Sequence, residues 1–129
     1  MQPKTIHINN EERFLRRAIY TDPNYVRDDM TVTSFAFKLR KGEAGLSGDI
    51  ESMTTYEKSI TNIEKYRLFA VIVGEIRDLG LDCEHKPEDE NYAHAEIIGD
   101  NSNPVRSKLA KSAVYILYPP HKPIREIAV

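Results

Sequence analysis

The sequence predicts a single α+β domain with a mixed or mostly antiparallel sheet and about three helices. The length of 129 residues suits one domain. Hydrophobic residues make up 40% of the chain and charged residues 29%, a balance typical of a globular protein. Short β-branched runs alternate with helix-capping signals, which indicates strands and helices in one chain. We place this domain at residues 1–118 and an extended, proline-rich tail at residues 119–129.

The first third of the chain leaves one choice between helix and strand open. A capping-box spacing precedes Phe14–Tyr20, whose apolar residues fall on one face of a helix. A strand is the alternative there, because β-branched and aromatic residues cluster in the same segment. Thr31–Leu39 alternates in the pattern of a strand that points Phe35 and Phe37 to one side.

The later elements follow from capping signals, β-branched runs and glycine or proline stops. They are a glycine-bearing loop at 42–48, a helix from about Thr55 to Lys65, a strand at 67–73, a short helix at 74–79, strands at 81–85 and 92–99, and a helix opened by Asn103 and Pro104. Residues 114–118 either continue that helix or form a strand. The expected core residues are Phe35, Phe37, Ile60, Ile63, Leu68, Val71, Val73, Ile97 and Leu109.

Charge is spread unevenly along the chain. Residues 1–42 hold eight basic and five acidic residues, residues 43–100 hold five and fourteen, and residues 101–129 hold five and one. If the two ends pack together, the molecule has a basic side, which suits a phosphate-bearing ligand or an acidic protein partner. The alternative is a solvated surface that binds nothing.

Several function classes are excluded or disfavoured by the composition. Cys83 is the only cysteine, so neither an internal disulfide nor a zinc site built on cysteines can form. The longest apolar run is too short to span a bilayer, and the start of the chain lacks the apolar stretch of a signal peptide. We therefore expect a cytoplasmic protein without a membrane partner.

The segment NYAHAEIIGD places His94 and Glu96 on one face of a predicted strand. A His-x-Glu pair occurs in zinc-dependent base deaminases, but there a Pro-Cys-x-x-Cys completes the metal site, and no cysteine follows Ala95 here. One alternative is a metal site formed by His85, His94 and Glu96. Another is a structural role, in which His94 is half-buried and hydrogen-bonded to a strand neighbour. We predict that His94 and Glu96 are catalytic and that His94 faces the same cleft as Arg17 and Ser47 without binding metal.

Two further segments could hold a phosphate. In GDNSNPVRSK a loop enters a helix, whose free N–H groups favour anions, and Arg106 and Lys108 follow. An ordinary capped helix with a solvated basic face is the alternative. Arg16-Arg17, Ser34 and Gly45-Leu-Ser47 could bind a dinucleotide pyrophosphate through charge and hydroxyl contacts, as in ADP-ribosyl-transferring folds. Ordinary surface and turn residues are the alternative.

The chain also resembles a pattern of small bacterial proteins of no assigned activity: an early Arg, Ser-x-Ala-Phe, Leu-Ser and Asn-x-Ala-His-Ala. In this sequence the pattern corresponds to Arg17, to Ser34–Phe37 one residue out of step, to Leu46-Ser47 and to Asn91–Ala95. Gly48 stands where that pattern commonly has Val. The resemblance implies that Arg17, Ser47 and His94 belong to one site.

Two hypotheses of function follow. The first is recognition of a nucleotide or other phosphate-bearing ligand, with NAD among the candidate cofactors and ADP-ribosyl transfer as a candidate reaction. The second is a non-catalytic protein-interaction module that uses the basic ends and acidic middle of the chain. Nucleic acid has weaker support as a partner, and the tail offers Ile124–Ala128 as a strand through which copies of the chain could associate.

Overall fold

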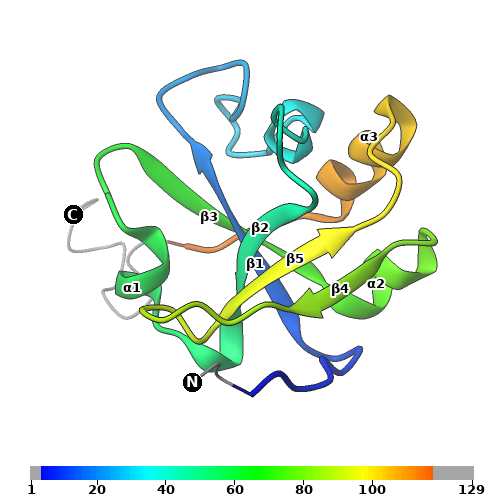
Figure 1. Ribbon diagram of the computed structural model, residues 1–129. Helices are drawn as coiled ribbons and strands as arrows, with labels where there is room; N and C mark the ends of the chain where they lie inside the picture. Colours follow the sequence, from blue (N-terminus) through cyan, green and yellow to red (C-terminus); the bar gives the residue numbers. More distant parts are fainter. Residues whose placement is uncertain (1–3, 118–129) are drawn as a thin grey trace.

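The computed structural model describes residues 4–117, which form six strands in one antiparallel sheet and three α helices (Figure 1). The α+β fold with about three helices is confirmed. The strands are β1 (Arg13–Ile19), β2 (Leu46–Ile50), β3 (Tyr66–Ile72), β4 (Asp82–His85), β5 (His94–Ile98) and β6 (Val114–Tyr115). Their order in the sheet is β4-β5-β2-β1-β3-β6. The helices are α1 (Tyr56–Ile60), α2 (Val73–Asp78) and α3 (Asn103–Ser112), with short 3-10 turns η1 (Ser34–Phe37) and η2 (Glu51–Met53).

The sheet has two faces of different character. Alternate residues of β1, such as Phe14 and Ala18, join the large core that η1, α2 and α3 cover. The opposite face holds a smaller apolar cluster under α1, formed by Leu15, Ile60, Leu68 and Ala70. Because α1 has only five residues, it covers β1 and β3 but leaves the same face of β2 and β5 to polar side chains.

The segment Thr31–Leu39 is not a strand, which corrects one expectation. It forms a single bridge between Val26 and Val32 and then the turn η1. Backbone groups of this segment bond to the side chain of Asn101 and not to a neighbouring strand. Asn101 Oδ1 accepts from the Leu39 N–H at 2.8 Å, and Asn101 Nδ2 donates to the Phe37 carbonyl at 2.8 Å.

The change of structure in this segment also changes its side-chain directions. Phe37 is fully buried, as expected, whereas Phe35 is 48% exposed and does not belong to the core. Ile63 is only partly buried, against the small cluster under α1. The other core predictions are confirmed: Ile60, Leu68, Val71, Val73, Ile97 and Leu109 are buried.

Residues 14–19 form strand β1, so the strand alternative was correct there and the helix was wrong. The helix expected to reach Lys65 ends at Ile60, because Thr61 adopts a positive φ of 60°. The loop expected at 42–48 instead leads into β2 at Leu46. Gly48 permits this pairing, because a Cβ there would overlap the Phe14 ring and the Leu15 carbonyl oxygen.

The remaining expectations agree with the structure to within a residue or two. The structure contains the strands expected at 67–73, 81–85 and 92–99 and the helices expected at 74–79 and from Asn103. For the segment that could be helix or strand, residues 114–115 form a strand. The predicted tail at residues 119–129 lies outside the described residues. Within the part of the chain that the structure describes, none of the helices has the length and apolar character needed to cross a membrane.

Candidate functional site

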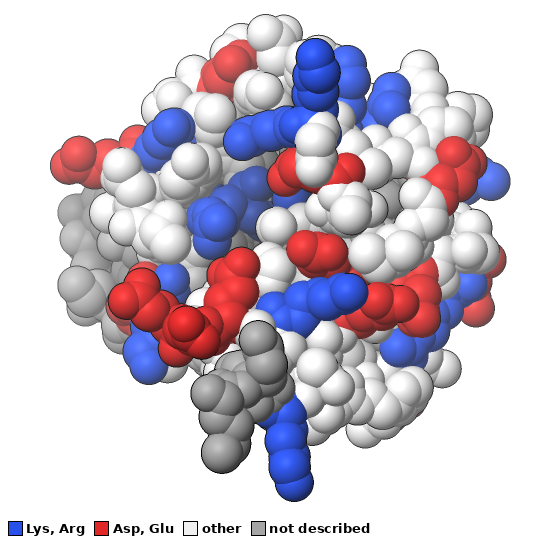
Figure 2. Space-filling model, viewed as in Figure 1, with Lys and Arg blue, Asp and Glu red and all other residues white. Residues whose placement is uncertain are grey.

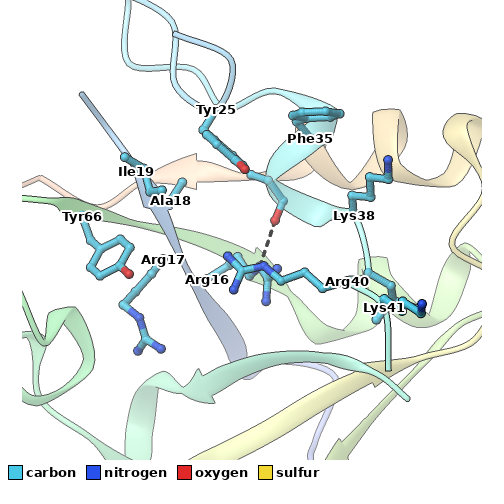
Figure 3. Close-up of a pocket in the computed structure, with 12 residues that line it drawn as sticks. Arg16, Arg17, Ala18, Ile19, Tyr25, Phe35, Lys38, Arg40, Lys41 and Tyr66 are labelled. Atoms are coloured by element: carbon cyan, nitrogen blue, oxygen red, sulfur yellow. Dashed lines mark hydrogen bonds between the residues drawn. The ribbon is translucent and has the colours of Figure 1, made fainter. Parts of the chain in front are cut away.

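A basic pocket of about 410 Å³ opens between β1, the start of β3 and the segment around η1 (Figure 3). Its lining combines five cationic side chains, three aromatic rings and four aliphatic residues, and contains no acidic residue. The residues are Arg16, Arg17, Ala18, Ile19, Tyr25, Phe35, Ala36, Lys38, Leu39, Arg40, Lys41 and Tyr66. We call this cavity the basic pocket.

Arg16 is the innermost cation of the basic pocket. Its Nε donates to the Ala36 carbonyl at 2.9 Å and its Nη1 to the Ser47 carbonyl at 2.6 Å. Burial lowers the pKa of Arg16 to about 10, and repulsion from Arg40 and Arg17 adds to the effect, while Glu43 opposes it. Arg16 is therefore a desolvated charge whose direct partners are neutral carbonyl groups.

Arg13, three residues earlier on β1, shows the contrasting arrangement. Its guanidinium makes a two-bond ion pair with Glu51, at 2.8 and 2.6 Å, which together with Coulombic attraction raises the pKa of Arg13. A buried or half-buried arginine normally has such a carboxylate partner. Arg16 differs from Arg13 in that its hydrogen-bond partners are carbonyl groups and not a carboxylate.

Arg17 joins the basic pocket to the polar face of the sheet. It is exposed, donates one bond to the Ser59 carbonyl at 2.8 Å, and lies 5.8 Å from the centre of the Tyr66 ring. Among the described residues, its other N–H groups have no hydrogen-bond partner. Guanidinium donors in this state match the oxygen atoms of a phosphate.

Aromatic rings line the mouth of the basic pocket. The rings of Tyr25 and Phe35 lie 5.8 Å apart, and Lys38 Nζ lies 5.4 Å from the centre of the Phe35 ring. Figure 3 shows Phe35 and Lys38 on the same side of the cavity, above Arg16 and Arg40. Flat exposed rings beside cations are a suitable surface for a nucleobase attached to phosphate groups.

Four polar side chains lie on the face of β2 and β5 beside α1: Ser47, Asp49, His94 and Glu96. Ser47 pairs with Glu96 and Asp49 with His94 in the β2–β5 ladder, so all four point to the same side. Arg17 lies on this side too, because Leu15, two residues earlier, pairs with Asp49. We call Arg17, Ser47, Asp49, His94 and Glu96 the polar row.

His94 and Ser47 are in direct contact. His94 Nε2 lies 3.2 Å from Ser47 Oγ, and His94 Nδ1 lies 2.8 Å from the Lys86 carbonyl oxygen. His94 is 9% exposed and Ser47 is half-buried. This contact places the Leu-Ser and Asn-x-Ala-His-Ala segments of the sequence pattern side by side.

Asp49 is hydrogen-bonded to two residues that contact the polar row, Ser59 and Asn91. Its buried carboxylate accepts from Ser59 Oγ and from Asn91 Nδ2, each at 2.7 Å. Ser59 in turn holds Arg17, and Asn91 begins the turn that leads to His94. Asp49 and Asn91 are therefore positioning residues that the sequence predictions did not include.

Glu96 is half-buried and makes no hydrogen bond or ion pair with any described residue. Its ladder partner on β4 is Glu84, another carboxylate, and a Cβ on Gly45 would meet the Glu96 carboxylate at 3.0 Å. Glu84 is paired with Lys86, whose Nζ lies 3.4 Å from Glu84 Oε1, whereas Glu96 has no such ion pair. Glu96 is available to a ligand in a way that the ion-paired carboxylates are not.

The remaining predicted site residues lie elsewhere. Ser34 lines a second hollow, together with Arg27, Ser107 and Lys111. Arg106 donates to Asn101 and Asn103 at the start of its own helix, and Lys108 is exposed on α3. The structure thus brings Arg17, Ser47, His94 and Glu96 together and leaves Ser34, Arg106 and Lys108 apart from them.

Charges of both signs are mixed on this side of the molecule. Figure 2 shows several basic side chains on the upper and central part of the face, with acidic side chains among and below them and further basic side chains at the lower edge. The sequence signal for the basic pocket is the run Lys38-Leu-Arg-Lys41, which adds three cations to Arg16 and Arg17. The sequence predicts a strand that ends at Leu39 and a loop after it, and it assigns no pocket to this run.

Among residues 4–117, no group of three His, Cys, Asp or Glu side chains is arranged to hold a metal ion. Both ring nitrogens of His85 are engaged instead, one by the Ile6 N–H at 3.0 Å and one with the Tyr92 carbonyl at 2.7 Å. Comparison with protein-family models, curated proteins and solved structures gave no match for this chain. The site must therefore be interpreted from its own chemistry.

Proposed function

We propose that the protein recognises a nucleotide or other phosphate-bearing ligand in the basic pocket. The observation that carries this proposal is Arg16, a buried guanidinium bonded only to carbonyl groups, surrounded by four more cations. Keeping such a charge desolvated is costly unless an anion binds beside it. A phosphate group supplies that anion and matches the fork of an arginine.

The shape of the site favours a ligand with two different parts. The guanidinium groups of Arg16, Arg17 and Arg40 suit one or two phosphates, while the exposed ring of Phe35 suits a nucleobase. Arg17 also belongs to the polar row, so a longer ligand could reach from the pocket to Ser47 and Glu96. These features make NAD and its fragment ADP-ribose the ligands to test first.

Transfer of ADP-ribose is the reaction we propose for such a ligand. Breaking the bond between ribose and nicotinamide leaves positive charge on the sugar, which a nearby carboxylate stabilises. Glu96 is a carboxylate without a protein partner, on the strand next to Ser47. In this proposal Arg17 holds the diphosphate, Glu96 stabilises the sugar cation, and His94 handles a proton.

We expect ADP-ribose to bind with an affinity that falls as salt is added, because charge pairing is screened by ions. Replacing Arg40 with alanine should weaken binding about 10-fold, since a hydrogen bond to a charged group contributes about 1.5–3 kcal/mol. Isothermal titration calorimetry of the full chain measures both effects. Lys108→Ala is the matched control, because Lys108 is an exposed cation outside the pocket.

Equal weakening by Arg40→Ala and Lys108→Ala would show general charge attraction and no defined site. If ADP-ribose, NAD and inorganic pyrophosphate all fail to bind, the ligand proposal is wrong. The protein-interaction hypothesis, with an acidic partner on the basic side, would then be the better account.

A further inference from the structure

The tautomer of His94 follows from its two neighbours. The Lys86 carbonyl oxygen can only accept a hydrogen bond, so His94 Nδ1 carries the hydrogen and donates across 2.8 Å. Nε2 of the neutral ring then bears a lone pair. The Ser47 hydroxyl, 3.2 Å away, donates its hydrogen to that lone pair. A serine hydroxyl bonded to a histidine that is oriented on its other side is the arrangement of an activated nucleophile.

A carboxylate also lies on the Nδ1 side of the imidazole. Glu88 Oε2 lies 3.8 Å from His94 Nδ1, close enough to stabilise the ring once the ring gains a second proton. Glu88 is exposed, and the Lys86 carbonyl is the direct orienting group. Both contacts come from the loop between β4 and β5, so the short hairpin fixes the ring. The Lys86 carbonyl therefore orients the ring so that Nε2 faces Ser47 Oγ.

We propose that Ser47 is a nucleophile, that His94 is its general base, and that the pair attacks the ribose of a dinucleotide held in the basic pocket. This inference rests on the proposed function and adds a covalent step to it. Arg17 links the two sites, because it lines the pocket and lies on the same face of the sheet as Ser47 and His94. A ligand whose phosphate contacts Arg17 can therefore extend to Ser47.

The step balances without any added reagent. Ser47 Oγ forms a bond to the anomeric carbon of the ribose, and the bond from that carbon to the nicotinamide nitrogen breaks. The electron pair of the broken bond goes to the positively charged pyridine ring, which leaves as neutral nicotinamide. The Ser47 hydrogen moves to His94 Nε2. Water or an acceptor hydroxyl then attacks the same carbon, and the bond from that carbon to Ser47 Oγ breaks. His94 returns its proton to Ser47 Oγ, and the proton of the attacking hydroxyl passes to solvent.

Two probes test the pair. A fluorophosphonate forms an oxygen–phosphorus bond with an activated serine as its phosphorus–fluorine bond breaks, and it needs no pocket ligand. The full chain should be labelled at Ser47, and labelling should be lost in Ser47→Ala and slowed about 100-fold in His94→Gln, the scale of general-base assistance. Ser52→Ala, which changes an exposed serine, should label like the wild type. Mass spectrometry locates the label, and circular dichroism confirms that each variant folds.

The second probe is NAD. Incubation should give a chain heavier by one ADP-ribose at Ser47, and the adduct should be absent from Ser47→Ala. A folded protein that neither reacts with the fluorophosphonate nor gains ADP-ribose would overturn the nucleophile assignment, even if calorimetry shows that ADP-ribose binds. If the fluorophosphonate labels Ser47 and NAD binds, but no ADP-ribose adduct forms, the claim that Ser47 attacks the ribose would be wrong. Absence of binding by NAD, ADP-ribose and inorganic pyrophosphate would refute the proposed function, and the fluorophosphonate result would then decide the serine–histidine pair alone.

Discussion

Replacing Phe37 with alanine should lower the free energy of unfolding by about 3–5 kcal/mol. The Phe37 ring is fully buried in the large core, where η1 packs against α3. Truncation removes its apolar surface from the core and leaves a cavity that the sheet on one side and α3 on the other cannot readily fill. Chemical denaturation followed by circular dichroism measures the change.

Phe35 is the matched control, because it lies two residues away in the same turn and is 48% exposed. Its replacement by alanine should change the stability by no more than about 0.5 kcal/mol. The same variant should weaken the binding of ADP-ribose, since it removes the proposed stacking surface for the base. Equal destabilisation by the two variants would contradict the position of η1 described above.

Replacing Arg16 with methionine should weaken ADP-ribose binding about 100-fold, which is the loss expected when a two-pronged, charge-assisted contact to phosphate disappears. Methionine fills similar space but carries no charge. Arg13→Met is the matched control on the same strand, because Arg13 is already paired with Glu51. Calorimetry should show nearly unchanged affinity for the control.

The pH dependence of binding follows from the pKa of Arg16, which burial lowers to about 10. Below that pH the guanidinium is charged and attracts the phosphate. As the pH rises through 10 the free protein loses this charge, so affinity should fall. The fall should be shallower in Arg16→Met than in the wild type. A wild-type affinity that stays constant through this range would show that Arg16 keeps its charge there and that its pKa lies higher.

Periodicity predicted most of the sheet correctly, because the β-branched run at 67–73 and the short strand at 92–99 have strong local signals. It failed at Thr31–Leu39, where the alternation of a strand is present but the backbone bonds to the side chain of Asn101. That partner is more than sixty residues away in sequence. The local sequence pattern cannot reveal that a distant side chain provides the hydrogen bonds that a neighbouring strand would provide.

The candidate site was predicted in part for a similar reason. Alternation along one strand placed His94 and Glu96 on one face, and the resemblance grouped Ser47 and Arg17 with them. The basic pocket depends on the turn η1, where the sequence predicts a strand, and no sequence motif indicates that Lys38, Arg40 and Lys41 line a cavity. Asp49 lacked any local signal, because its partners Ser59 and Asn91 come from separate segments.

A crystal structure of the protein grown with ADP-ribose tests the central claim most directly. The proposal predicts the diphosphate against Arg16 and Arg17 in the basic pocket, the adenine on the Phe35 ring, and the ribose directed toward Ser47 and Glu96. A diphosphate bound instead at the start of α3, near Arg106 and Lys108, or a basic pocket left free of ligand at saturating ADP-ribose, would contradict it.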